Sequence, residues 1–164
     1  MRTGSRLSLA SLLLATVMLM GTPALLLAHD YTLQWRDGTL IENNAEYAEF
    51  QAPYVKINGV ELSRFAHMTR VEELRKLKVP GIEGSEDVHV FQVWQGGASQ
   101  GLQLMAVTLS DVGVDVIGPL EPDFETIEIV DHNGDQGPLF RLYSADTNPV
   151  AIYEYFDGQM LRQK

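Results

Sequence analysis

The stretch VHVFQVWQGGASQGLQLMAVTLSDVGVDVIG, residues 88–118, decides which fold this sequence encodes. Its first seven residues are apolar on both faces, which is typical of a central strand that other layers cover. A glycine-rich segment, 96–101, follows, and residues 102–112 then fit either a helix or a buried strand. A helix there would complete an α/β unit, whereas a strand would complete an antiparallel hairpin. From the sequence, both interpretations remain open.

Within this stretch, Gly97-Ala98-Ser99-Gln100-Gly101 matches the pattern G-x-S-x-G. The glycines of this pattern allow a tight strand-to-helix turn that exposes the serine hydroxyl. The segment resembles the nucleophile elbow of α/β-hydrolases, and IEIVDHNGD (127–135) resembles their later strand and acid loop. The resemblance implies a small serine hydrolase with Ser99 as nucleophile. No histidine follows His132, so the general base is missing from its expected place, and the sequence favours a non-enzymatic role while leaving activity open.

Hairpin signals occur along the rest of the chain. Apolar and β-branched runs flank a series of dipeptides that tolerate positive φ at tight turns: Asp37-Gly38, Asn58-Gly59, Asn133-Gly134 and Asp157-Gly158. The runs around the last two turns, together with a further turn at 145–149, predict an antiparallel meander over the last forty residues.

One short helix is predicted near residues 70–78. Thr69 and Glu72 have the spacing of a capping box, and the pair Pro80-Gly81 would end the helix. An apolar stripe at helical spacing supports it, made of Val71, Leu74 and Leu77. The expected fold class is therefore α+β, mainly antiparallel β with hairpins and a C-terminal meander, and with this one helix.

The N-terminus predicts an export signal at residues 1–28, followed by a single β-rich soluble domain at 29–164. Arg2 and Arg6 precede an uncharged, leucine-rich run of signal-peptide length. Removal of this signal would place the domain in the periplasm or outside the cell, with no membrane span left after processing.

Two cleavage sites fit the end of this signal, one after Ala24 and one after Ala28. Cleavage after Ala28 is favoured, because residues 25–28 are apolar and would make an awkward mature terminus. An uncleaved anchor is the alternative, since residues 7–28 exceed the roughly 20 apolar residues that a spanning helix needs.

Charge and composition limit the partners of the mature chain. The chain carries 12 Lys and Arg against 22 Asp and Glu, and the loss of Arg2 and Arg6 would lower its net charge from −10 to −12. Residues 80–139 contain no Lys or Arg at all. Such a field repels nucleic acid and suits a cationic ligand or a protein partner. The absence of cysteine excludes disulfides, thiolate metal sites and cysteine nucleophiles.

Candidate metal ligands are the four histidines His29, His67, His89 and His132. None of them forms a pair at a zinc-ligand spacing. Cleavage after Ala28 would leave His29 at the mature N-terminus, where the α-amine and the imidazole Nδ1 can chelate copper. The segment HDYTL at 29–33 is also similar to the mature start of periplasmic copper chaperones.

The sequence thus predicts an exported, non-enzymatic binding or assembly protein of the periplasm or cell exterior. Copper handling is one form of that role, and a hydrolase built on Ser99 is the alternative. An exposed apolar patch or an open sheet edge would favour assembly. Histidines that converge on His29 would favour copper.

Overall fold

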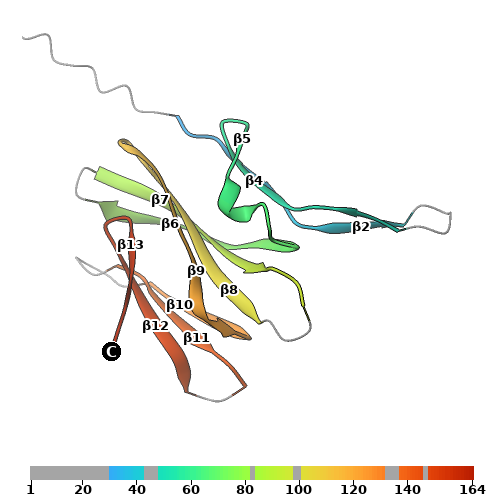
Figure 1. The fold of residues 1–164 in the computed structure, drawn as a ribbon. Helices are drawn as coiled ribbons and strands as arrows, with labels where there is room; N and C mark the ends of the chain where they lie inside the picture. The colour runs from blue at the N-terminus through green and yellow to red at the C-terminus, as the bar shows by residue number, and fades with distance from the viewer. Residues whose placement is uncertain (1–29, 43–47, 82–83, 98–100, 132–136, 146–147) are drawn as a thin grey trace, which may run out of the picture.

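The computed structural model of the chain describes residues 30–42, 48–81, 84–97, 101–131, 137–145 and 148–164. These residues form layers of antiparallel strands, from which one long hairpin projects (Figure 1). The prediction of a mainly antiparallel β fold is confirmed. In the part of the chain that the structure describes, no helix has the length and apolar character needed to cross a membrane.

The strands are grouped into separate sheets. In chain order they are β1 (Leu33–Arg36), β2 (Thr39–Glu42), β3 (Ala48–Gln51), β4 (Tyr54–Ile57), β5 (Val60–Glu61), β6 (Arg70–Gly81), β7 (Gly84–Trp94), β8 (Leu102–Ser110), β9 (Gly113–Phe124), β10 (Thr126–Val130), β11 (Leu139–Tyr143), β12 (Pro149–Phe156) and β13 (Gln159–Arg162). A 3-10 turn, η1 (Ser63–Phe65), lies between β5 and β6. The sheets have the strand orders β1-β4-β5, β2-β3, β6-β7-β8-β9 and β10-β11-β12-β13.

The central sheet, β6 to β9, contains the stretch that the sequence left ambiguous. Residues 102–110 form strand β8, which pairs antiparallel with β7 and β9 along its length. The hairpin interpretation is therefore correct, and the α/β unit is not formed. Both faces of β7 are buried, with Val88 and Val90 on one face and Phe91 and Val93 on the other. A strand covered on both faces needs a nearly continuous apolar run, which explains why its sequence lacks alternation.

Two layers cover the central sheet. The C-terminal meander, β10 to β13, packs on one face, and the small sheet β1-β4-β5 with η1 packs on the other. The meander forms in the predicted strand order and contributes to the core the side chains of Phe140, Leu142, Ala151, Tyr153 and Tyr155. The second core cluster combines odd-numbered residues of β7 and β8 with Val55, Ile57, Phe65 and Met68.

The predicted helix at residues 70–78 is wrong, because these residues belong to strand β6. The strand pairs with β7 over its whole length, with a bulge between Glu73 and Arg75. The bulge reverses which face the following side chains occupy, so Val71 packs in one core cluster and Leu77 in the other. A bulged strand buried on both faces thereby places apolar residues at a spacing that imitates a helix.

The two residues of the predicted capping box instead make hydrogen bonds to β7. The Thr69 hydroxyl donates to the carbonyl oxygen of Trp94 at 3.1 Å, and Glu72 accepts a hydrogen bond from Gln92 at 2.5 Å. Both contacts tie the start of β6 to β7. The helical element among the described residues is the 3-10 turn η1, which comes just before the predicted position.

Two predicted turns close hairpins as expected. Asn58 and Gly59 have φ of 51° and 80° between β4 and β5, and Asp157 and Gly158 have φ of 46° and 70° between β12 and β13. Positive φ at both central residues is the signature of a type I′ turn. The predicted turn at 133–134 lies outside the described residues, although the strands on either side of it pair.

The predicted hairpin turn at Asp37-Gly38 is wrong. These residues join β1 to β2, which pair with β4 and β3 respectively, so the four strands make one long, bent hairpin. Asp37 Oδ1 accepts hydrogen bonds from the backbone N–H groups of Gly38 at 2.7 Å and Val71 at 2.8 Å. A Cβ atom at position 38 would collide with the carbonyl oxygen of Thr69. Glycine is therefore needed for close approach at this bend.

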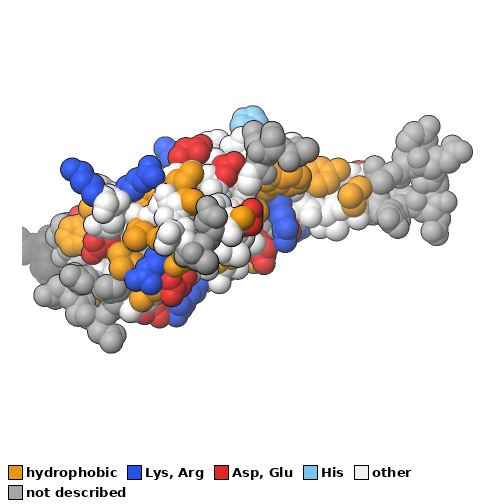
Figure 2. All heavy atoms as spheres, turned by 90° about the horizontal axis from the view of Figure 1, so that it is seen from below, with side chains coloured by type: hydrophobic (Ala, Val, Ile, Leu, Met, Phe, Trp, Pro, Cys, Tyr) orange, Lys and Arg blue, Asp and Glu red, His pale blue; other side chains and the backbone are white. Residues whose placement is uncertain are grey.

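Strands β2 and β3, called the arm below, extend beyond the packed layers (Figure 1). Leu40 is 65% exposed and Phe50 is 49% exposed, and the two residues pair directly across the arm. The surface view shows apolar side chains along this projection (Figure 2). The arm therefore presents apolar surface that no layer of the described residues covers.

Candidate acid-lined binding site

A cavity with a volume of about 320 Å³ lies at the end of the central sheet, where the start of β7 meets two hairpin turns. Its described lining comes from the start of β7, the β8–β9 turn and the β12–β13 turn: Gly84, Ser85, Glu86, Ser110, Asp111, Val112 and Asp157. The charged side chains in this lining are all acidic. We call it the acidic cavity.

Glu86 is the buried acid of this cavity, with 9% of its surface exposed. The Tyr155 hydroxyl donates to Glu86 Oε2 over 2.5 Å, and it also lies 3.1 Å from Thr108 Oγ1. The backbone N–H of Gly158 donates to the same tyrosine oxygen at 3.1 Å. A buried carboxylate needs such partners, since removing it from water is costly. Among the described residues, none donates a hydrogen bond to the other carboxylate oxygen, Glu86 Oε1.

Tyr155 is held in its neutral form. Burial raises the pKa of its phenol well above the ordinary value, and the hydrogen bond to the Glu86 carboxylate raises that pKa further. A neutral phenol keeps its proton available for donation across the whole physiological pH range. The pair therefore fixes Glu86 as an acceptor at the base of the acidic cavity.

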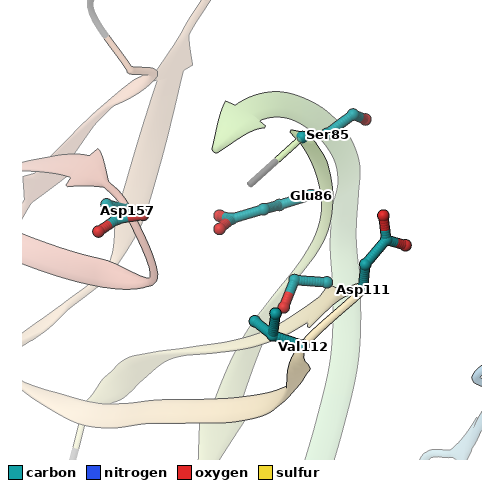
Figure 3. Close-up of a pocket in the computed structure, with 7 residues that line it drawn as sticks. Ser85, Glu86, Asp111, Val112 and Asp157 are labelled. Atoms are coloured by element: carbon teal, nitrogen blue, oxygen red, sulfur yellow. The ribbon is translucent and has the colours of Figure 1, made fainter. Parts of the chain in front are cut away.

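The labelled side chains show how the acids are distributed. The Glu86 carboxylate extends from β7 toward the turn that carries Asp157, whereas Asp111 points to the other side of its hairpin (Figure 3). A second cavity of about 240 Å³ adjoins on that side and shares the lining residues Ser85, Ser110 and Asp111. Its charges are closer to balance, because Lys78 also lines it and Asp87 is paired with Lys76 Nζ at 2.8 Å.

The chemistry of the acidic cavity is that of a hydrogen-bond acceptor. Carboxylates accept from cationic N–H donors in short, charge-assisted hydrogen bonds. Within the described ranges, no group of three or more His, Asp or Glu residues is placed to hold a metal ion. Separated carboxylates suit an extended organic cation better than a compact metal ion, which needs several ligands around one point.

Two of the four predicted histidine ligands lie among the described residues. His67 is exposed just after η1. His89 is buried beneath the N-terminal sheet, where its Nδ1 lies 2.5 Å from Glu73 Oε1, and Glu73 Oε2 accepts from Trp35 Nε1 at 2.9 Å. His89 is thus a core histidine with a hydrogen-bond partner. Its place inside the core explains why an apolar strand carries it.

The other predicted site residues, His29, Ser99 and His132, lie outside the described residues. Copper binding by His29 and the inertness of Ser99 therefore stay predictions. The segment that follows Ser99 is strand β8, whereas a nucleophile elbow requires a helix at that point.

Sequence reasoning did not single out Glu86, Asp111, Tyr155 or Asp157 as a site. Two sequence signals concern Glu86 and Asp111: both lie in the long interval without Lys or Arg at 80–139, and Glu86 is an acid at the start of an apolar strand. Neither signal identifies Tyr155 as the partner of Glu86, because the two residues are 69 positions apart.

Comparison with known proteins gives no matching family model, no matching curated protein and no matching solved structure. Function is therefore inferred here from the side chains and their geometry. The observation most relevant to function is a buried carboxylate that faces a cavity whose described charged side chains are all acidic.

Proposed function

We propose that this chain is an exported, non-enzymatic binding protein that takes an organic cation into the acidic cavity. The observation that carries the proposal is Glu86, a buried carboxylate whose Oε1 has no donor among the described residues. Asp157 lies across the cavity from it (Figure 3). An ammonium or guanidinium group placed between them would donate to Glu86 Oε1 and offset the charge of this largely buried carboxylate.

The size and lining of the acidic cavity support a small ligand. A volume of about 320 Å³ lies at the lower end of the range for small-molecule sites, roughly 300–1,000 Å³. The exposed side chain of Val112 at the rim offers apolar contact to a short alkyl chain. An alkylamine or the end of a lysine or arginine side chain combines both features.

The overall charge supports the same class of ligand. A net charge of −10 attracts cations toward the protein and lowers the barrier to their entry at low ionic strength. If the predicted export signal at residues 1–28 is removed, this binding would take place in the periplasm or outside the cell. Added salt should lower the affinity, because ions at 0.1 M largely screen the attraction between exposed charges that are more than about 10 Å apart.

The test is calorimetric titration of the purified chain with pentylammonium and agmatine, with pentanol as the neutral probe. We expect saturable binding of the two cations and none of pentanol. Glu86→Gln keeps the shape and the acceptor for Tyr155 but removes the charge, so its affinity should fall by about tenfold or more. Glu154→Gln makes the same change on β12 outside the cavity and should bind like the original chain.

Two results would contradict the proposal. One is the absence of saturable binding by either cation at millimolar concentration. The other is equal affinity in the original chain, Glu86→Gln and Glu154→Gln, which would assign any binding to the diffuse negative surface and not to Glu86.

A further inference from the structure

Gly81 lies at the end of β6, beside the buried carboxylate of the acidic cavity. Beyond the bulge, Leu77 and Val79 point toward the meander, and the alternation of the strand puts Gly81 on the same face. Glu86 lies on that face too, because it pairs with Val79 and precedes Val88 by two residues. Gly81 and Glu86 are therefore diagonal neighbours across the β6–β7 hairpin.

A side chain at position 81 has no room while Glu86 keeps its conformation. A Cβ atom there would lie 2.6 Å from Glu86 Oε1 and 2.8 Å from both Cδ and Cγ of the same side chain. Carbon atoms in favourable contact are about 3.5–4.0 Å apart. Rotation of the carboxylate alone would leave Cγ and Cδ where they are, so it cannot relieve the contact. The whole glutamate side chain would have to move.

The backbone gives no other reason for glycine at this position. Gly81 has no positive φ and lies in a strand, whose extended backbone any residue type can adopt. Its partner Gly84, in contrast, has a φ of 136° and is needed for the backbone itself. The row that contains position 81 is otherwise apolar, with Leu77 and Val79 before it. Glycine therefore interrupts this row at the point where the Glu86 carboxylate needs the space.

Displacement of Glu86 would remove both interactions of its carboxylate. Oε2 would lose the hydrogen bond that the Tyr155 hydroxyl donates over 2.5 Å, and the charge would no longer extend toward Asp157 across the acidic cavity (Figure 3). We infer that Gly81 is a positioning residue of the acidic cavity, because the absence of a side chain there holds the Glu86 carboxylate in place for a cation. This role rests on the proposed cation binding, but the contact between Gly81 and Glu86 can be tested without a ligand.

The ligand-free test is a double-mutant cycle in melting temperature. Gly81→Ala should lower the melting temperature by roughly 5 °C, because the displaced carboxylate loses its buried hydrogen bond. In a Glu86→Ala chain the same change should cost nothing, since the side chain that it would meet is absent. The control is Gly113→Ala at the start of β9, where a Cβ atom has no neighbour within 4 Å and φ is not positive. It should change the melting temperature by about 2 °C or less.

The second test measures whether Gly81 affects binding through Glu86. In calorimetric titration with pentylammonium, Gly81→Ala should lower the affinity by about tenfold, and Gly113→Ala should leave it unchanged. Glu86→Gln and Gly81→Ala/Glu86→Gln should have the same weak affinity, because the charge that Gly81 positions is already absent from both.

Either of two results would overturn the inference. One is an equal loss of melting temperature on Gly81→Ala in the original and the Glu86→Ala chains, which would mean that Gly81 makes room for another group. The other is full pentylammonium affinity in Gly81→Ala. If Gly81→Ala does not fold, Gly81→Ala/Glu86→Ala must still fold for the inference to hold. Absence of cation binding by the original chain would contradict the proposed function, whereas the melting cycle would still decide whether Gly81 positions Glu86.

Discussion

The C-terminal meander and the arm are built from the same kind of local structure, yet they have opposite environments. Both consist of antiparallel strands with apolar residues. In the meander, Phe140 and Leu142 are completely buried against the central sheet, whereas Leu40 and Phe50 of the arm are exposed. Strand pairing alone leaves a two-stranded ribbon only marginally stable in water. Burial against a second layer supplies most of the favourable free energy.

The largest expected difference in stability comes from replacing one phenylalanine by alanine in each region. Phe140→Ala would open a cavity between the meander and the central sheet, and we expect it to lower the free energy of unfolding by about 3–5 kcal/mol. Phe50→Ala on the arm should change it by roughly 0.5 kcal/mol or less, as other surface substitutions do. Urea denaturation of the two variants and the original chain measures both changes. Equal losses would mean that the arm is part of the folded core.

A smaller difference is expected between the loss of a tyrosine hydroxyl on the inner face of the meander and the same loss on its outer face. Tyr155→Phe removes the donor to Glu86 Oε2 and should destabilise the fold by about 1–3 kcal/mol, because a buried carboxylate then lacks its partner. Tyr143→Phe removes an exposed hydroxyl that donates to Glu128, and water can replace that contact. Its unfolding curve should stay close to that of the original chain. If Tyr155→Phe left the free energy of unfolding unchanged, the buried Glu86 carboxylate would have to be stabilised by other contacts.

The same tyrosine predicts an alkaline limit to stability. The pKa of Tyr155 is raised in the folded protein, so the fold holds this phenol neutral more strongly than the unfolded chain does. The resulting stability is fully present below the ordinary tyrosine pKa of about 10 and is lost as the pH rises above it. Melting temperatures between pH 8 and 11 should fall for the original chain and fall less steeply for Tyr155→Phe. Parallel profiles would contradict this assignment.

The smallest effect is expected on the outer face of the meander at acid pH. Hydrogen bonds from Arg141 and Tyr143 lower the pKa of Glu128. This contribution is present above the ordinary glutamate pKa and is lost as the pH falls through the lowered value. Because the Glu128 side chain is exposed, Glu128→Gln should flatten the acid side of the melting profile only slightly, and 1 M salt should remove the difference. A difference that persists in 1 M salt would indicate a buried interaction.

Several features of the fold follow from the sequence because they depend on neighbouring residues. Asn58-Gly59 and Asp157-Gly158 close type I′ turns since the positive φ values of these turns are local preferences. The run at 88–94 indicates a strand covered on both faces because each of its faces is apolar. The strand order of the meander follows from short turns between consecutive apolar runs.

Other features depend on partners that are distant in the sequence, and only the tertiary structure decides them. Residues 70–78 have the spacing of a helix, but pairing with β7 and a bulge make them a strand. Asp37-Gly38 looks like a hairpin turn, but Val71 and Thr69 make it the bend of a longer hairpin. The acidic cavity forms because Glu86 meets a tyrosine 69 positions away. Local preferences amount to about 1 kcal/mol per residue, and burial of a side chain in a paired sheet exceeds that amount.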